Sequence, residues 1–400
     1  MVILQVERVA MLLATIMATM MQCYVDGFTV QSNFDFAVNM RRRRRARRQR
    51  VLAAALAAVR PGHGERRLRR QPVDDPRQMR PRSLVWWEET ALHADARFWK
   101  ENFRMTRQSF QLLCNTLSPS LQRESSNGLA VEKVVAIALY RLSTPCDLRT
   151  IGNLFGVGRS TVCEIVQEVC KAVVSLMLEQ YIVWPADDRL RQTIDCFEGK
   201  YGFPQCAGAV DGTHIPIIAP KNNPADYHNR KGQHSIILQA VVDDKLRFTD
   251  INVGWPGRVH DARWNREING VLMPIVILGD PAYPLLPWLM KGFSEGVNFD
   301  DPKRNFNYRL SRARMVVERG FGQLKGRWRI LMRRNDSALL KVPQMVSACC
   351  VLHNFCLEQN EGYDDRWDAP DNNQPINVPL NDQDVGSGVD IRNALLRYFS

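Results

Sequence analysis

Apolar residues in the first half of the chain recur at helical spacing. The pattern begins near Ser83–Leu92 and continues through Phe103–Leu117, where intervals of three and four residues separate the apolar positions. The sequence Ser118-Pro119-Ser120 then interrupts it. We therefore expect an all-helical segment in this part of the chain.

A helix–glycine turn–helix pattern occupies Leu148–Val173. A short apolar helix is followed by Gly156-Val157-Gly158 and by a longer helix with one apolar stripe. This order is typical of a helix-turn-helix, in which the first residues of the second helix are offered to DNA. Those residues are Arg159, Ser160 and Thr161. The alternative is a helical hairpin packed inside its own domain, with Ser160 serving only as a helix cap.

The period changes to that of strands after Trp184. Three strands are predicted, at Cys206–Ile217, Ser235–Asp243 and Leu246–Gly257. Asp243 and Asp244 then belong to a hairpin turn rather than to a catalytic site. Pro274–Asp280 is a continuous apolar run, which favours a buried strand of parallel type.

Helices are predicted around and after that buried strand. They cover Arg258–Ile268, Met315–Leu331 and Pro343–Gln359. Strands and helices in this order indicate an α/β domain with a mixed sheet. The predicted domains are a leader and arm at 1–82, a helical domain at 83–183, an α/β domain at 184–360, and an acidic tail at 361–400. We expect the tail to be mostly disordered, with a short helix near its end.

The positive charge is concentrated in one segment. The 400-residue chain carries a net charge of +12, and Arg41–Arg82 alone contains 16 arginines against three acidic residues. Its first ten residues read RRRRRARRQR, which predicts a nuclear-import signal or a polyphosphate-binding arm. The alternative is a solvated stretch with no dedicated partner. The residues of the import signal would be Arg41, Arg42, Arg43, Arg44, Arg45, Arg47, Arg48 and Arg50.

The cysteines and the N-terminal segment bear on metal or disulfide frameworks and on membrane or secretion segments. Ten cysteines are present without any C-x-x-C pair, which favours reduced core cysteines over a zinc or disulfide framework. Val9–Met21 is apolar but short for a membrane span. Glu7 precedes it and no A-x-A-like cleavage site follows, so a helix or leader without a membrane is favoured over a secretion signal.

Three acidic residues each interrupt or end an apolar element. Asp211 lies inside the strand AVDGTHIPI, where a lone buried carboxylate costs roughly several kcal/mol. Asp280 ends the buried strand, a position where ligands bind in open α/β sheets. Glu318 lies one position round from a helical stripe formed by Val317, Phe321, Leu324, Trp328 and Leu331. Asp261 is a fourth candidate, whose alternative is a residue that favours the start of a helix.

Gathering carboxylates needs a compensating charge. Two unit charges about 4 Å apart repel by roughly 4 kcal/mol at an effective dielectric near 20. Mg²⁺ or Mn²⁺ reverses that sign, prefers oxygen ligands and activates phosphodiester chemistry. The four carboxylates Asp211, Asp261, Asp280 and Glu318 are therefore the predicted metal ligands and catalytic residues.

Six stretches resemble one protein family, the PIF/Harbinger transposase superfamily with its transposase-derived nucleases. They are AVDGTHIPI, YHNRKGQHSI, VGWPGRVHDAR, LGDPAYPL, ERGFGQLKGRWRIL and CCVLHNFC, in family order between about 103 and 358. The resemblance implies a ribonuclease-H-like catalytic domain of the DDE type behind a helical DNA-binding part. It makes Asp211 the first catalytic aspartate and Glu318 the closing glutamate, and leaves the second aspartate open between Asp261 and Asp280.

The resemblance also implies DNA as substrate and a Myb/SANT-like DNA-binding partner. In the matching NRKG segment, Arg230 and Lys231 would hold phosphate, with a solvated loop as the alternative. Lys325, Arg327 and Arg329 follow Glu318 and would contact the DNA backbone, unless they are ordinary helix-surface charges. The expected protein is a nuclear, metal-dependent DNA nuclease or transposase. The alternative is a DNA-binding or chromatin-adaptor protein that no longer cleaves, and self-association into a homo-oligomer is left open.

Overall fold

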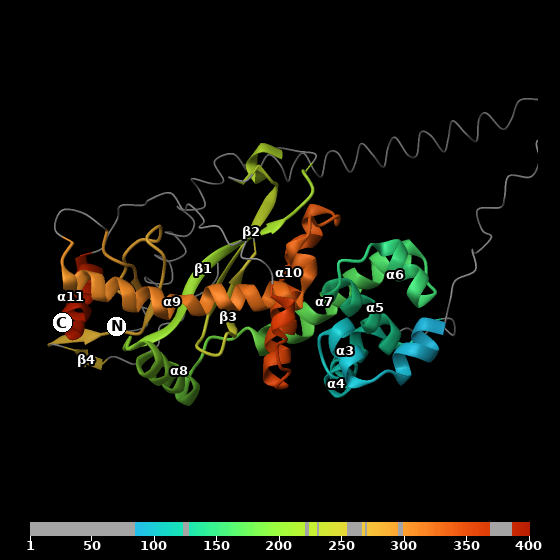
Figure 1. The fold of residues 1–400 in the computed structure, drawn as a ribbon, viewed down its shortest axis with the longest axis horizontal. Coiled ribbons are helices and arrows are strands. Elements are labelled where there is room, and N and C mark those ends of the chain that lie inside the picture. Colours follow the sequence, from blue (N-terminus) through green and yellow to red (C-terminus); the bar gives the residue numbers. More distant parts are fainter. Residues whose placement is uncertain are drawn as a thin grey trace, which may run out of the picture. The chain divides into compact units, whose positions relative to one another are not determined.

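The computed structural model describes residues 85–122, 128–220, 224–229, 232–253, 266–268, 270–294, 299–368 and 386–400 (Figure 1). All of these belong to one compact unit of the chain. The predictions made for the leader, the arginine run, Arg230, Lys231 and Asp261 lie outside the described residues. No helix of the described part is long and apolar enough to cross a membrane.

Helices form the described chain up to Tyr201. After short helical turns at Trp86–Thr90 and Ala91–His93, the helices are α3 (Ala96–Phe103), α4 (Arg107–Leu121), α5 (Val131–Ser143), α6 (Leu148–Phe155), α7 (Arg159–Tyr181) and α8 (Asp187–Tyr201). The expected helical segment is thus confirmed, but it is divided. Arg104 adopts a left-handed conformation with φ of 66°, and the Thr106 side chain caps α4. Pro119 does not end α4, which continues to Leu121.

The predicted helix–turn–helix pattern corresponds to α6 and α7. Gly156 ends α6 with φ of 70°, a conformation that favours glycine. Gly158 is the N-cap of α7, so the alternative role of Ser160 as the cap is wrong. The apolar stripe of α7 is buried and packs against α4, α5 and α10 (Val342–Glu358). The first turn of α7 stays accessible, with Arg159 and Ser160 exposed and Thr161 half-buried.

A five-stranded mixed sheet forms the second part, in the order β3-β2-β1-β6-β7. Its strands are β1 (Cys206–Pro216), β2 (Ser235–Val242), β3 (Phe248–Asn252), β6 (Val276–Leu278) and β7 (Leu289–Met290). The first three are antiparallel, whereas β6 pairs with β1, and β7 with β6, in parallel. This mixed α/β order fits a ribonuclease-H-like fold and confirms the strands predicted by periodicity.

The β2–β3 turn is held by Asp243, one of the two acidic residues that the sequence assigns to it. Asp243 is fully buried, and its Oδ1 accepts hydrogen bonds from the backbone N–H groups of Lys245 and Arg247. Its other oxygen, Oδ2, is 2.9 Å from Nε of Arg247. These contacts stabilise the hairpin, as predicted.

The helix expected at Arg258–Ile268 is contradicted where the chain is described. Arg266–Ile268 is a strand, β4, and pairs with β5 (Val271–Met273). Gly270 between them has φ of 76°. The Asn-Gly sequence at this point is a strong hairpin signal, and it overrides the helical spacing of the preceding apolar residues.

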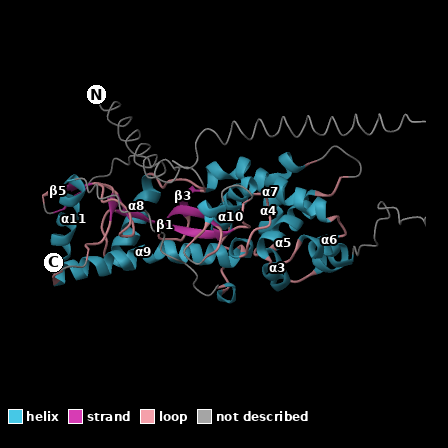
Figure 2. Cartoon of the chain, turned by 90° about the horizontal axis from the view of Figure 1, so that it is seen from above, coloured by secondary structure: helices cyan, strands magenta, loops and turns pink. Residues whose placement is uncertain are grey.

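Two long helices complete the described unit. Helix α9 (Asp301–Arg327) packs along β1, β2 and β6, and α10 packs against α7 and β3 (Figure 1). Helix α9 starts earlier than predicted because the Asp300 side chain caps it and Pro302 follows. Helix α11 (Gly386–Phe399) lies against α9 and confirms the short helix expected near the end of the chain. In Figure 2 helices make up most of the described chain; β1 and β3 of the sheet lie in its middle, whereas β5 lies at one end beside α11.

Asn354 of α10 connects the helical part to the sheet. Its Nδ2 donates to the carbonyl oxygens of Tyr181 and Phe248, both at 2.8 Å, and its Oδ1 accepts from the Phe248 N–H at 3.0 Å. A buried amide with three such contacts fixes α7, β3 and α10 relative to one another.

The cysteines of this part lie where the sequence predicts. Six of them are buried and unpaired, namely Cys114, Cys170, Cys206, Cys349, Cys350 and Cys356. Burial raises the pKa of the Cys170 thiol to about 12. These thiols behave as small apolar core groups.

Candidate active site

Asp211 lies in the central strand of the sheet. Within β1 it pairs with Ala240 of β2, and its side chain is 15% exposed. Its Oδ1 accepts a 2.7 Å hydrogen bond from the N–H of Gly212. A carboxylate here is held by the backbone on one oxygen, which leaves Oδ2 for other partners.

Asp280 reaches the same level of the sheet from the neighbouring strand. Ala209 of β1 pairs with Leu278 of β6, and the two strands are parallel. Asp211 and Asp280 each follow those paired residues by two positions. Asp280 is 8% exposed, and its Oδ1 accepts from the N–H of Ala282 at 3.0 Å. The register thus places the two carboxylates at the same level, Asp211 in the middle of β1 and Asp280 just beyond the end of the parallel strand β6, where open α/β sheets bind ligands.

Glu318 is joined to this pair through an arginine of its own helix. Arg314 Nη2 donates to Glu318 Oε1 at 2.9 Å, and Arg314 Nη1 donates to Asp211 Oδ2 at 3.2 Å. One guanidinium therefore bridges the central strand and α9. The spacing of four residues between Arg314 and Glu318 is the signal that could have suggested this pair, but it does not reveal the contact with Asp211.

The site is short of positive charge. Burial raises the pKa of Asp211 to about 6, even though Arg314 and the Gly212 N–H act in the opposite direction. Asp280 and Glu318 add to the rise through their own negative charge. Burial also raises the pKa of Asp280 above its ordinary value, again against Arg314. The single positive charge of Arg314 does not balance the negative charges of the three neighbouring carboxylates.

Tyr283 lies close to the charged groups of the site and was not predicted. Its hydroxyl accepts a 2.8 Å hydrogen bond from Nε2 of Gln239, and its ring lies against Gly279, where an added Cβ would approach within 3.2 Å. The charges of Asp211, Asp280 and Arg314 all influence the pKa of this hydroxyl, which burial raises. A tyrosine three residues after a strand-ending aspartate is the only signal that the sequence offered.

Lys325 extends the site along α9. It follows Glu318 by seven residues, about two helical turns, and Thr213 follows Asp211 by two residues on the same face of β1. Lys325 Nζ donates to Thr213 Oγ1 at 2.5 Å. The ammonium group thus lies beside the strand that carries Asp211.

Arg327 does not have the surface position predicted for it. Its side chain is fully buried and donates to the carbonyl oxygens of Arg104 and Glu361 at 3.0 and 3.2 Å. It also lies against the rings of Tyr363 and Trp367. The expected contact of Arg327 with DNA is therefore wrong, because the guanidinium is buried and donates its hydrogen bonds to groups inside the protein.

Arg329 lies beyond the end of α9 rather than on it. It is half-buried, and its Nη2 donates to the carbonyl oxygen of Arg366 at 3.3 Å. Its contact with DNA, like that of Lys325, Arg159, Ser160 and Thr161, stays a prediction.

The donor set suits a hard divalent cation. All three described candidates offer carboxylate oxygens, the ligands that Mg²⁺ and Mn²⁺ prefer, and burial, with smaller contributions from Asp280 and Glu318, raises the pKa of Asp211 and so disfavours its ionised form. Within the described residues, no three carboxylate, histidine or cysteine side chains converge closely enough to hold a metal ion. Arg314 instead contacts two of the carboxylates. The residues fit a cation once that guanidinium moves.

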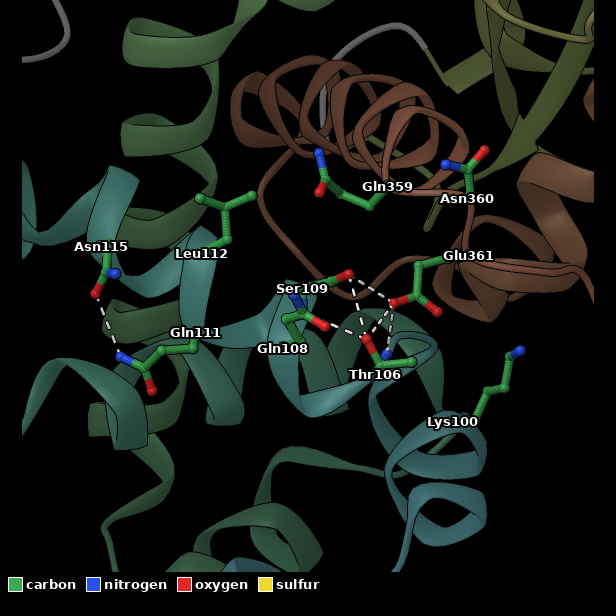
Figure 3. Close-up of a pocket in the computed structure, with 10 residues that line it drawn as sticks. All are labelled: Lys100, Thr106, Gln108, Ser109, Gln111, Leu112, Asn115, Gln359, Asn360 and Glu361. Carbon is green, nitrogen blue, oxygen red and sulfur yellow. Dashed lines mark hydrogen bonds between the residues drawn. The ribbon is translucent and has the colours of Figure 1, made fainter.

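A cavity of about 580 Å³ lies elsewhere, between α3, α4 and the segment after α10 (Figure 3). None of the carboxylates described above lines it. Glu361 faces it, and its Oε1 accepts from the N–H and hydroxyl of Thr106 and from the hydroxyl of Ser109. These contacts give Glu361 a structural role in fixing the start of α4.

Comparison with known proteins agrees with this geometry. Residues 210–354 match the model of a DDE superfamily endonuclease, which spans Asp211, Asp261, Asp280 and Glu318. The protein "Antagonist of like heterochromatin protein 1" of Arabidopsis thaliana is 31% identical over 291 residues, which are 65% of this chain and 72% of that protein. The chain belongs to the PIF/Harbinger transposase superfamily.

Animal members of the Harbinger group are also similar to this chain. The protein named "Putative nuclease HARBI1" of Homo sapiens is 29% identical over 280 residues, which are 66% of this chain and 78% of that protein. Residues 84–175 match a domain of unknown function, so the helical part has a family counterpart without an assigned role. No solved structure matches the chain.

Proposed function

We propose that this Harbinger-family chain is a metal-dependent DNA endonuclease of the DDE transposase type. The observation that carries the proposal is the alignment of Asp211 and Asp280 on adjacent parallel strands, with Glu318 linked to Asp211 through Arg314. Nuclease membership rests on the endonuclease match over the same residues. That these carboxylates cleave DNA phosphodiester bonds is our inference beyond that match.

Asp211, Asp280 and Glu318, assisted by Asp261, would hold Mg²⁺ or Mn²⁺. The bound cation would supply Lewis acidity toward a phosphodiester and its attacking water or DNA 3′-hydroxyl. The chain itself contributes preorganisation. The Gly212 and Ala282 N–H groups orient the two aspartates, and a hydrogen bond from Gln239 holds the Tyr283 hydroxyl in place.

Several cationic and polar side chains would contact the DNA. They include Lys325, which lies beside the strand that carries Asp211, together with Arg329 and with Arg230 and Lys231 of the NRKG segment. Arg159, Ser160 and Thr161 at the accessible start of α7 would contact a second stretch of duplex. The arginine run from Arg41 to Arg50 would direct the chain to the nucleus. The family resemblance adds a Myb/SANT-like partner for targeting.

A second candidate is a chromatin adaptor that binds DNA without cutting it. The observation in its favour is the name of the Arabidopsis relative, an antagonist of like heterochromatin protein 1. In that case the carboxylates would have no catalytic part, and metal would not lead to cutting of the DNA. The two candidates differ in whether the bound duplex is cut.

A plasmid-nicking assay tests the proposal. Purified full-length chain is incubated with supercoiled DNA in Mg²⁺, in Mn²⁺ or in EDTA, with and without a nuclear extract that supplies a targeting partner. We expect metal-dependent nicking that Glu318→Gln abolishes. The matched control Glu179→Gln, at an exposed position of α7, should nick like the wild type. Shifted but uncut DNA under every condition would favour the adaptor.

A further inference from the structure

Arg314 occupies the centre of the carboxylate site. Its side chain is 19% exposed, and its two terminal nitrogens contact different elements, Asp211 on β1 and Glu318 on α9. Its charge also acts on Asp280 and on the hydroxyl of Tyr283. It is therefore the cation around which the described site is assembled.

The oxygens that Arg314 uses are those a metal ion would need. Asp211 Oδ1 is already bound by the Gly212 N–H, so Oδ2 is the oxygen of Asp211 most available to a ligand, and Arg314 holds it. Glu318 Oε1 is held in the same way. A divalent cation at these oxygens would also be repelled by the guanidinium beside it. Arg314 and a metal ion consequently compete for one place.

The Arg314 guanidinium lies beside a solvent-facing part of α9 to which it could move. Glu318, one turn further along the same face of α9, is exposed, so this face of the helix borders solvent. A DNA phosphate at that face would offer two oxygens in the geometry that an arginine fork prefers. Phosphate binding would thus draw Arg314 away from the carboxylates.

We propose that Arg314 is an internal counter-cation that closes the metal site until DNA phosphate displaces it. The proposal rests on the proposed nuclease function. Because each ligand removes an obstacle to the other, DNA and the divalent cation bind cooperatively, and the coupling is reciprocal. In the absence of DNA the chain binds metal weakly and keeps its carboxylates paired.

The test is a titration of the full chain with Mn²⁺, with and without a short DNA duplex. Free Mn²⁺ is measured by its electron paramagnetic resonance signal. The variants are Arg314→Gln, Arg314→Lys and the control Arg319→Gln, which removes the same charge from an exposed neighbour on α9. The signal of Mn²⁺ bound by the duplex alone is subtracted. Circular dichroism checks that each variant is folded, and Arg314→Lys serves as the test if Arg314→Gln is not.

Without DNA we expect Arg314→Gln to bind Mn²⁺ about 10-fold more tightly than the wild type, since two partly exposed ion pairs no longer compete. Arg314→Lys should show a smaller gain, about 3-fold, because it keeps the charge but loses the two-pronged contact. DNA should tighten Mn²⁺ binding about 10-fold in the wild type and in Arg319→Gln, and less than about 2-fold in Arg314→Gln.

Equal Mn²⁺ affinity of the wild type and Arg314→Gln would overturn the counter-cation proposal and leave the nuclease proposal standing. Weaker binding by Arg314→Gln would do the same, since Arg314 would then help to build the site. Absence of Mn²⁺ binding in every variant, with DNA present, would reject both proposals together.

Discussion

Replacing the central aspartate should stabilise the protein when metal is absent. Asp211→Asn keeps an oxygen for the Gly212 N–H and removes a charge that burial disfavours. The pKa of Asp211 rises from its ordinary 3.8 to about 6 in the folded chain. This is a shift of about two pKa units. Above pH 6, ionisation of Asp211 therefore lowers the free energy of unfolding by about 3 kcal/mol.

The sign of the effect fixes its pH dependence. A raised folded pKa means that wild-type stability is highest below pH 3.8 and falls as pH rises from 3.8 to 6, where it levels off. Asn cannot ionise, so it escapes that loss. The gain of Asp211→Asn over wild type should be about 3 kcal/mol at pH 8, about half of that at pH 5, and under about 1 kcal/mol at pH 4.

Urea unfolding in EDTA, followed by tryptophan fluorescence from pH 4 to pH 8, measures this gain. Asp301→Asn is the matched control, since that side chain is 92% exposed at the start of α9 and should change stability little. An Asp211→Asn chain that is no more stable than wild type at pH 8, or equally stabilised at pH 4, would refute the reasoning. In that case the aspartate would not be a strained, charge-deficient group.

Three further changes probe the framework around the site. Arg327→Met should cost about 3 kcal/mol in urea unfolding, because the carbonyl oxygens of Arg104 and Glu361 lose a buried donor, whereas exposed Arg319→Met should cost under about 0.5 kcal/mol. Asn354→Ala should cost about 3 kcal/mol by the same measurement, since three buried hydrogen bonds are lost; an effect below 1 kcal/mol would contradict this accounting. His353 is buried with its pKa lowered to about 3, chiefly by burial, so stability should be lost as pH falls from 6.5 toward 3, by about 3 kcal/mol at pH 4. His353→Gln should flatten that acid slope in urea midpoints, and an unchanged slope would assign it to other groups.

Much of the sheet and of the carboxylate site could be predicted from local pattern. Period-two alternation identified β1 and β2, and an unbroken apolar run identified β6. Asp211 and Asp280 were recognisable because a charge inside or at the end of such a strand is costly. The alignment of these two aspartates depends on strand register, which a single sequence does not encode locally.

The remaining features depend on contacts between distant residues. Arg314 touches Asp211 across 103 positions, so only its pairing with Glu318 was visible in the sequence. Arg327 has the charge of a surface residue, yet its partners Arg104 and Glu361 come from two other parts of the chain. Helical spacing in Arg258–Ile268 was misleading because the decisive signal was the turn that follows it.

The most direct test of the central claim is cleavage of a labelled DNA duplex by the wild type and by Asp211→Asn, in Mg²⁺ or Mn²⁺. This variant is expected to be the more stable of the two, so lost activity could not be attributed to unfolding. We predict metal-dependent cutting by the wild type and none by Asp211→Asn, although both bind the duplex. Cutting by both proteins at equal rates would contradict the account, because the central carboxylate would then have no part in the chemistry.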